Sequence, residues 1–253
     1  MKLNFKEIAK EIALSRISKT KNIMLSYEDF KYVSLSDAYL IQAKVINFLQ
    51  REVVGWKLGG VNLKTRSMFN VNELYWGPIF DKCILNDSSE LMMNCGEVEV
   101  AFKFNNDIEN LIKKITPEDL SDYVQSVALS IEYPYSIFSN VKEIGVSALI
   151  SDCCGSGQCL LGKEIPFDQF SEDVNIIVNI DTVDVEMCST DILIDGLYQT
   201  VCDFINKSLE FGLELKSGQW VFTGGLSECR PYEVNSFVRI ESNILPSISY
   251  GVV

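Results

Sequence analysis

The first fifty residues of the chain carry apolar side chains at the spacing of amphipathic helices. In the first segment, apolar residues recur three or four positions apart, at Phe5, Ile8, Ala9, Ile12 and Ala13. This spacing predicts a helix over residues 5–18. A second helix is predicted to begin at Ser36, a good N-cap, and to run to Leu49. The chain is therefore expected to open with two helices joined by a polar connection.

From Val53 onward the apolar residues form short β-rich runs separated by turns. Two helices are predicted to interrupt these runs, one after Thr116 and one over residues 192–211. Helices followed by strands with inserted helices indicate an α+β fold with a curved mixed sheet. The predicted strands cover residues 53–58, 77–85, 97–104, 127–133, 174–180, 219–222, 237–240 and 248–253.

Composition narrows the partners that the chain can have. With 253 residues, 47% of them hydrophobic, it can bury a substantial core. Its net charge of −13 is spread along the chain, which argues against nucleic acid or an anionic membrane surface as a partner. Met1 to Glu7 carry charge where a signal peptide needs an apolar core, and no later apolar run approaches the length of a membrane span. We therefore expect a cytoplasmic protein.

The sequence contains eight cysteines and no histidine. No two cysteines form a Cys-x-x-Cys pair, and most lie in apolar surroundings, which favours reduced, buried thiols. Cys153, Cys154 and Cys159 lie close together, but their spacing matches no common thiolate metal site. Without histidine, catalysis by a Ser-His-Asp or Cys-His arrangement is excluded. Any metal site must then use oxygen ligands, which favours Mg²⁺, Mn²⁺ or Ca²⁺ over zinc.

Glu97 and Glu99 are the most informative motif of the sequence. They lie in an alternating run over residues 96–104, so both carboxylates share one face of a strand while apolar side chains share the other. Two like charges side by side are costly in a cleft unless a cation lies between them. Glu132, in a second alternating run, is a third candidate ligand for an octahedral Mg²⁺ site. The alternative is that the pair lines the solvent-exposed face of an ordinary antiparallel strand.

Three further candidates stand where apolar runs meet glycines or turns. Lys57 is flanked by Trp56, Leu58 and nearby glycines. Burial in these surroundings would lower the pKa of Lys57 and permit proton transfer. The alternative is that it is simply a lysine at the end of a strand. Asp152 stands where a strand-like run gives way to a loop of small residues. It is a candidate to orient Lys57 or a water molecule, or alternatively a turn former. The hydroxyl of Thr223 is a candidate to bind a substrate carboxylate, although a plain β-turn explains this residue equally well.

These candidates belong to an ordered set of motifs that resembles a known family. The set resembles the fumarylacetoacetate hydrolase superfamily and, within it, the branch of 2-keto-4-pentenoate hydratase and 4-oxalocrotonate decarboxylase. The resemblance extends from the predicted helix at Ala38 almost to the C-terminus. The motifs are Gly55-Trp56-Lys57-Leu58-Gly59, Trp76-Gly77-Pro78, Gly96-Glu97-Val98-Glu99-Val100-Ala101-Phe102, Ser130-Ile131-Glu132, Ser151-Asp152, Leu161-Gly162 and Leu215-Lys216-Ser217-Gly218-Gln219-Trp220-Val221-Phe222-Thr223-Gly224.

The resemblance implies a rolled mixed β-sheet with N-terminal and peripheral helices. It implies a single hydratase-like domain over residues 1–253, with a helical N-terminal part (1–52) and a β-rich catalytic part (53–253). It further implies that a 2-keto acid and a divalent cation, Mg²⁺ or Mn²⁺, bind at one site, with Lys57 moving a proton. The metal ligands implied are Glu97, Glu99 and Glu132.

The resemblance also implies a reaction. The cation would act as a Lewis acid that stabilises an enolate, and water would add to a 2-hydroxy-2,4-dienoate. Decarboxylation of a 4-oxalocrotonate-like diacid is the alternative from the same class. Members of the family resemble one another in forming homo-oligomers, so we expect at least a dimer.

The sequence departs from the family at several positions. Tyr75 stands where the hydratases usually carry an aspartate, and we take it as a candidate substrate-binding residue. Ile137 replaces a frequent arginine, Cys153 follows Asp152 where an asparagine is common, and Asn235 opens the late turn that usually reads Gly-Asp. These departures also allow a non-catalytic relative that binds a keto acid or a partner subunit. The absence of histidine disfavours the carbon–carbon bond hydrolases of the family, which resemble one another in using a histidine to activate water.

Overall fold

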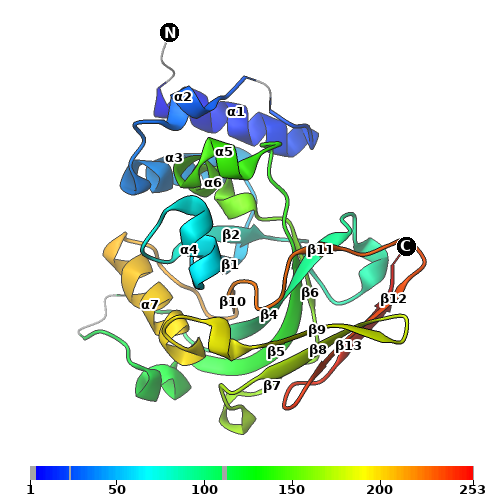
Figure 1. Ribbon diagram of the computed structural model, residues 1–253. Helices are drawn as coiled ribbons and strands as arrows, with labels where there is room; N and C mark the ends of the chain where they lie inside the picture. Colours follow the sequence, from blue (N-terminus) through cyan, green and yellow to red (C-terminus); the bar gives the residue numbers. More distant parts are fainter. Residues whose placement is uncertain (1–3, 23, 110–112, 253) are drawn as a thin grey trace.

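The computed structural model describes residues 4–22, 24–109 and 113–252. In these ranges a curled mixed sheet carries a layer of helices at one end (Figure 1). The predicted α+β fold with a rolled mixed sheet and N-terminal and peripheral helices is confirmed. None of the helices in these ranges has the length and apolarity that a bilayer span requires. The helices are α1 (Phe5–Ser18), α2 (Tyr27–Phe30), α3 (Leu35–Leu49), α4 (Leu63–Phe69), α5 (Val141–Ile144), α6 (Val146–Ser151) and α7 (Leu197–Glu210), with a 3₁₀ helix η2 (Pro117–Asp122) after Thr116.

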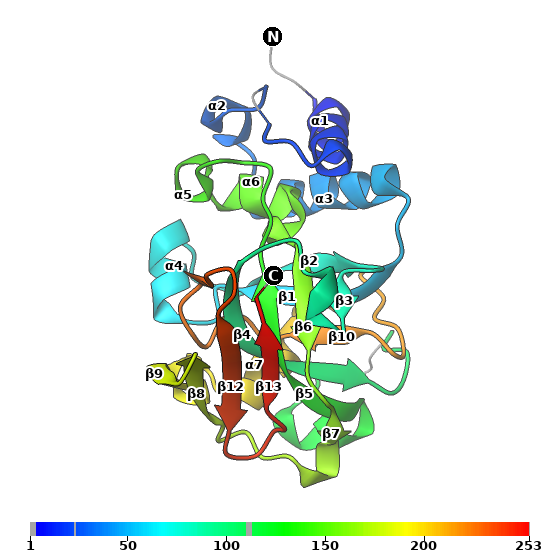
Figure 2. The same cartoon turned by 90° about the vertical axis from the view of Figure 1, so that its right-hand side faces the viewer.

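The strands of the described residues form two sheets. A nine-stranded sheet has the order β2-β1-β10-β4-β5-β6-β3, with β11 paired to β4 and β7 paired to β5. A four-stranded sheet has the order β13-β12-β8-β9; its strands β12 and β13, drawn in red, lie toward the viewer in Figure 2, with β8 and β9 to their left. The strands are β1 (Val53–Gly59), β2 (Tyr75–Phe80), β3 (Ile84–Leu85), β4 (Cys95–Phe104), β5 (Val124–Tyr133), β6 (Gln158–Leu161), β7 (Ile165–Pro166), β8 (Asn175–Ile180), β9 (Val183–Ser189), β10 (Trp220–Phe222), β11 (Arg230–Pro231), β12 (Phe237–Ser242) and β13 (Ile248–Gly251).

The two long N-terminal helices begin at capping side chains. Asn4 and Glu7 form a capping box at the start of α1, in which each side chain accepts a hydrogen bond from the other residue's amide. Helix α3 begins after Ser34, whose hydroxyl accepts a hydrogen bond from the amide of Asp37. The prediction of Ser36 as the N-cap is therefore wrong by two positions. The buried faces of α1 and α3 pack with α6 in one apolar cluster.

Strands β4 and β5 have an apolar face that packs into the main core and a polar face on the other side of the sheet. They pair antiparallel, with Val98 opposite Ile131 and Val100 opposite Leu129. These side chains are fully buried in one cluster with apolar residues of the four-stranded sheet and α7. Because side chains alternate along a strand, the neighbouring polar residues of β4 and β5 face the other way. The core thus fixes which side of the sheet carries the polar positions.

Turns shift several predicted boundaries. The run predicted as one strand over residues 77–85 forms two strands, because Lys82 adopts the left-handed conformation (φ 61°) between them. The helix predicted over residues 192–211 begins only after Gly196, whose φ of 82° is not helical. Residue 253, the end of the last predicted strand, lies outside the described residues. Strands β6, β7, β9 and β11 and helices α2, α4 and α5 fall where no element is predicted, and helix α6 replaces a run predicted to be strand-like.

Arg16 ties helix α1 to the segment that follows β5. Its Nε donates to Oδ1 of Asp152 at 2.6 Å, and its Nη2 donates to the carbonyl of Asp152 at 2.5 Å. Nη1 and Nη2 also donate to the carbonyls of Ser156 and Tyr135, at 3.0 and 3.3 Å. The side chains of Arg16 and Asp152 are only 8% and 0% exposed. One guanidinium therefore connects the N-terminal helices to residues 135–156.

Replacing Arg16 tests the strength of this connection. Arg16→Met keeps an apolar stem but leaves the carboxylate of Asp152 buried without its cation. We expect the free energy of unfolding, measured by urea denaturation, to fall by about 3–5 kcal/mol. The control Arg239→Met breaks an exposed pair with Glu241 and is expected to cost at most about 1 kcal/mol. Equal, small losses for the two variants would contradict a role for Arg16 in holding the helices.

Candidate metal centre

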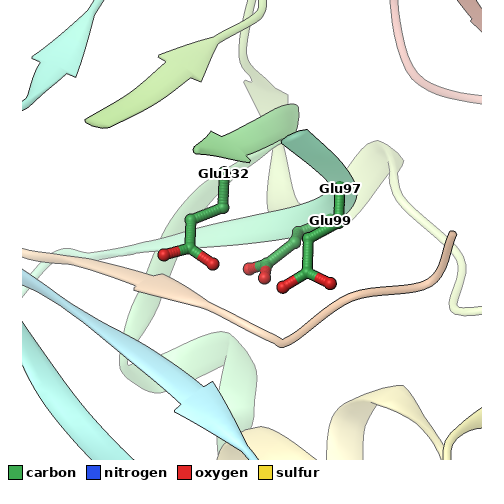
Figure 3. Close-up of side chains that lie close together, drawn as sticks. All are labelled: Glu97, Glu99 and Glu132. Atoms are coloured by element: carbon green, nitrogen blue, oxygen red, sulfur yellow. The ribbon is translucent and has the colours of Figure 1, made fainter. Parts of the chain in front are cut away.

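Three carboxylates from two neighbouring strands converge in one place. In the β4–β5 pair Glu97 lies directly opposite Glu132, and Glu99 lies opposite Ser130, so all three glutamates occupy the face that points away from the main core. Their side chains extend into the same space (Figure 3). One carboxylate oxygen from each residue lies within 4.8 Å of those of the other two. Glu99 and Glu132 are 0% exposed, and Glu97 is half-buried. The alternative of a strand face open to solvent is therefore wrong.

Burial and mutual repulsion disfavour negative charge on this cluster. Burial, with the charge of Glu132 added, raises the pKa of Glu97 to about 7. The same causes, together with the charge of Glu97, raise the pKa of Glu99 well above its ordinary value. Oε2 of Glu99 accepts a hydrogen bond from the amide of Gly224 at 3.1 Å. Oε1 of Glu99 is buried and has no hydrogen-bond partner in the described structure. Oε1 of Glu99 is thus a buried acceptor without a donor among the described residues, and it lies beside two more carboxylates. Such an arrangement is typical of a site that binds a cation.

Lys57 supplies a positive charge at this cluster. It lies on β1, and its Nζ donates to both carboxylate oxygens of Glu132, at 2.6 and 2.7 Å. Burial alone would lower the pKa of Lys57, but the carboxylates of Glu132, Glu97 and Glu99 outweigh it and raise the pKa above its ordinary value. The predicted lowering of this pKa is therefore wrong. The local sequence shows the desolvating neighbours of Lys57, whereas the opposing charges come from strands distant in the chain.

A cavity of about 610 Å³ opens onto this cluster. Lys57 and Glu97 lie on its wall, as do Lys21 and Lys64. Lys64 pairs with Glu228 at 2.8 Å. Lys21 donates to the carbonyl of Ser136 at 2.7 Å, and no carboxylate of the described residues pairs with it. The wall thus combines acidic groups with cationic groups, as a site for an anionic ligand and a metal requires.

Tyr75 lies on the cavity wall, as its role as a candidate substrate-binding residue requires. Its ring fills the space above Gly59, because a Cβ at that glycine would lie 2.3 Å from the ring. Burial raises the pKa of Tyr75. Among the described residues its hydroxyl has no hydrogen-bond partner. Tyr75 therefore presents a protonated hydroxyl to the cavity.

Two candidate residues do not take the places expected of them. The hydroxyl of Thr223 donates to the carbonyl of Val100 at 2.9 Å, and the cavity wall beyond it consists of Gly224 and Gly225. Asp152 lies at the end of helix α6, where a strand-like run is predicted, and its Oδ1 accepts from Arg16. Its Oδ2 accepts from the hydroxyl of Ser136 at 2.7 Å and the amide of Ile137 at 3.0 Å. Glu132, not Asp152, is thus the residue that orients Lys57.

Three groups near the site, the side chains of Arg16 and Lys21 and the amide of Gly224, are not among the candidate site residues, and the sequence signals them unequally. Arg16 extends the helical stripe of Ile8 and Ile12 by one further turn, and a charged residue on a buried stripe is a signal for a buried ion pair. Lys21 lies in the polar connection after α1, where no periodicity marks it. The amide of Gly224 is a backbone group, so only the fold brings it to Glu99.

No family model matches the chain, and no curated protein matches it. Solved structures match it in fold. The 4-oxalocrotonate decarboxylase from Pseudomonas putida G7, complexed with magnesium and adipate, is 17% identical, with a TM-score of 0.85 over 98% of this chain and 97% of that one. The fumarylpyruvate hydrolase from Pseudomonas aeruginosa, in complex with Mn²⁺ and pyruvate, is 15% identical, with a TM-score of 0.58 over 78% of this chain and 88% of that one. The chain therefore has the fold of the fumarylacetoacetate hydrolase family.

Proposed function

We propose that the chain is a metal-dependent enzyme of the fumarylacetoacetate hydrolase superfamily that acts on a 2-keto acid as a lyase. The observation that carries the proposal is the convergence of Glu97, Glu99 and Glu132 on one buried space beside Lys57. The match with the P. putida decarboxylase along nearly the whole of both chains supports it. On the same resemblance we expect the chain to work as a homo-oligomer.

The side chains of the cluster fit a hard divalent cation. All three donors are carboxylate oxygens, which Mg²⁺ and Mn²⁺ prefer. Lys57 offers one positive charge to three carboxylates, and Oε1 of Glu99 is left without a donor. We propose that Glu97, Glu99 and Glu132 hold Mg²⁺ or Mn²⁺. When bound, such a cation supplies Lewis-acid polarisation of the keto and carboxylate oxygens of a substrate.

The residues around the cluster have separate tasks in the proposed reaction. Lys57 lies on the cavity wall and holds a proton at Nζ against Glu132. The negative charge that raises the pKa of Lys57 would be offset by a cation bound by the three carboxylates. The proton would then be easier to pass to a substrate carbon. The amide of Gly224 fixes the carboxylate of Glu99. Tyr75 presents its hydroxyl from the position at which the hydratases usually carry an aspartate. In the leading proposal, this arrangement adds water to a 2-hydroxy-2,4-dienoate.

Lys21 favours a second candidate reaction, the decarboxylation of a 4-oxalocrotonate-like diacid. Lys21 lies on the cavity wall, and its Nζ donates to the carbonyl of Ser136 and pairs with no carboxylate of the described residues. Such a cation is suited to bind the second carboxylate of a diacid. The P. putida decarboxylase is complexed with adipate, which is itself a diacid.

Glu99→Gln tests whether the cluster binds a metal. In metal-free protein we expect this variant to be at least as stable as the wild type, because it removes a buried negative charge. At a Mn²⁺ concentration of about 100 times its dissociation constant, the wild type is expected to gain about 2.7 kcal/mol of stability and the variant far less. Thermal unfolding with and without Mn²⁺ measures both effects. The exposed control Glu233→Gln should respond like the wild type; an equal response of Glu99→Gln would contradict the site.

An assay of both candidate substrates tests the reaction. With Mg²⁺ or Mn²⁺ present, a hydratase lowers the absorbance of the dienol, whereas a decarboxylase acting on the diacid produces dienol and raises it. Lys57→Met is expected to lower kcat by a factor of about 10²–10⁴, because it removes the proton carrier. Lys114→Met, at an exposed lysine, should leave the rate unchanged. Metal-loaded protein that converts neither substrate would contradict the proposed lyase and favour a non-catalytic relative.

Lys21→Met separates the two candidate reactions. If Lys21 binds the second carboxylate of a diacid, its loss should weaken the binding of adipate by about ten- to a hundredfold, since a hydrogen bond to a charged group contributes about 1.5–3 kcal/mol. The binding of pentanoate, a monoacid, should change little. Lys64→Met is the matched control, because this wall lysine is already paired with Glu228. Calorimetry in the presence of Mg²⁺ measures the binding of both acids to both variants. An equal loss of affinity for adipate and pentanoate in Lys21→Met would contradict this role for Lys21.

A further inference from the structure

Two cysteines far apart in the sequence lie side by side, and one of them, Cys229, lines the cavity. The sulfurs of Cys95 and Cys229 are 3.3 Å apart, and both residues carry free thiols. Cys95 begins β4, and Cys229 immediately precedes β11, which pairs with β4 so that Pro231 lies opposite Cys95. None of the other six cysteines contacts a sulfur at hydrogen-bonding distance within the described ranges.

The two cysteines lie on two segments next to the carboxylate cluster. Cys95 precedes Glu97 by two residues, while Cys229 lies on the cavity wall and is exposed. Residues 224–229 lie close in space to the cluster and to the start of β4. A Cβ at Gly225 would lie 2.3 Å from Oε2 of Glu97, and the amide of Val98 donates to the hydroxyl of Ser227 at 2.8 Å. A change at either thiol therefore acts on backbone that touches the carboxylates.

We propose that Cys95 and Cys229 are a reversible dithiol–disulfide pair, and that the disulfide weakens divalent-cation binding at the carboxylate cluster. The oxidant is a hydroperoxide. One sulfur attacks the terminal oxygen of the hydroperoxide. The oxygen–oxygen bond breaks, and the rest of the peroxide leaves as an alcohol, or as water if the oxidant is hydrogen peroxide. The sulfur becomes a sulfenic acid and keeps the attacked oxygen. The second sulfur then displaces that oxygen, so that a sulfur–sulfur bond forms and a water molecule leaves. Two thiols are oxidised by two electrons, and one peroxide bond is reduced.

The expected effect on the cluster follows from bond lengths. Bonded sulfurs lie about 2.05 Å apart, so the disulfide must draw the two sulfurs, which are 3.3 Å apart, together by about 1.2 Å. This movement is shared between the start of β4, which carries Glu97, and residues 224–229, whose Gly224 amide holds Glu99. Octahedral coordination of Mg²⁺ tolerates little distortion. The exposure of Cys229 gives the oxidant access to the pair.

Treatment of the full chain with tert-butyl hydroperoxide tests the pair itself. We expect peptide mass spectrometry to find the peptides of Cys95 and Cys229 joined, with the loss of two hydrogens, and dithiothreitol to separate them. Cys95→Ser and Cys229→Ser should each abolish the cross-link. Cys188→Ser is the matched control, since Cys188 is a half-buried thiol with no sulfur partner in the described structure, and it should cross-link like the wild type. Thiols that stay free, or that join other cysteines, would overturn the inference.

Calorimetric titration with Mn²⁺ tests the effect on the cluster, which rests on the proposed function. Oxidation is expected to weaken Mn²⁺ binding about tenfold or more, as changes next to metal ligands commonly do, and dithiothreitol should restore it. The two serine variants should bind Mn²⁺ equally before and after peroxide. Unchanged affinity in the cross-linked wild type would overturn the proposed effect. A reduced wild type that binds no Mn²⁺ would overturn the proposed function together with this effect, whereas the cross-link is measured independently by mass.

Discussion

The repulsion among three carboxylates, two of them fully buried, is the constraint on which the site depends. Glu99 and Glu132 are shielded from solvent and Glu97 is half-buried, so water does little to balance their three negative charges. Lys57 provides one positive charge through its paired hydrogen bonds to Glu132. Oε1 of Glu99 has no donor in the described structure, and the pKa of Glu97 rises to about 7. A divalent cation would relieve each of these costs at once.

The fold keeps the carboxylates together in spite of this repulsion. The alternation of β4 places Val98 and Val100 in the core on one face, and thereby commits Glu97 and Glu99 to the other. The sheet order β1-β10-β4-β5 then brings Lys57 across to Glu132. Helix packing completes the cavity, because Arg16 fixes the segment over residues 135–156 that forms part of its wall. The apolar core thus stabilises an arrangement that the polar groups alone would oppose.

Local periodicity predicts much of this arrangement, and long-range geometry accounts for what it misses. The period of two predicts the strands that carry Glu97, Glu99 and Glu132, and the faces on which they lie, because alternation is a local property. The period of 3.6 likewise predicts α1. The apolar run ending at Asp152 is short enough to fit a strand or a helix, and packing against the N-terminal helices favours the helix α6.

Electrostatic partners are the other part that the sequence does not predict. The pKa of Lys57 is raised, not lowered, because Glu132 lies 75 residues away along the chain and yet binds its Nζ. Asp152 binds Arg16, a partner 136 residues distant, and so leaves Lys57 to Glu132. Such pairs depend on which strands and helices become neighbours, which no window along the sequence reveals.

A crystal structure with Mn²⁺, located by its anomalous scattering, tests the central claim most directly. We predict one strong anomalous peak between the carboxylates of Glu97, Glu99 and Glu132, at bonding distance from an oxygen of each. The same peak should be absent from crystals of Glu99→Gln. No peak at this position in the wild type at saturating Mn²⁺, or a peak held by other side chains, would contradict the claim.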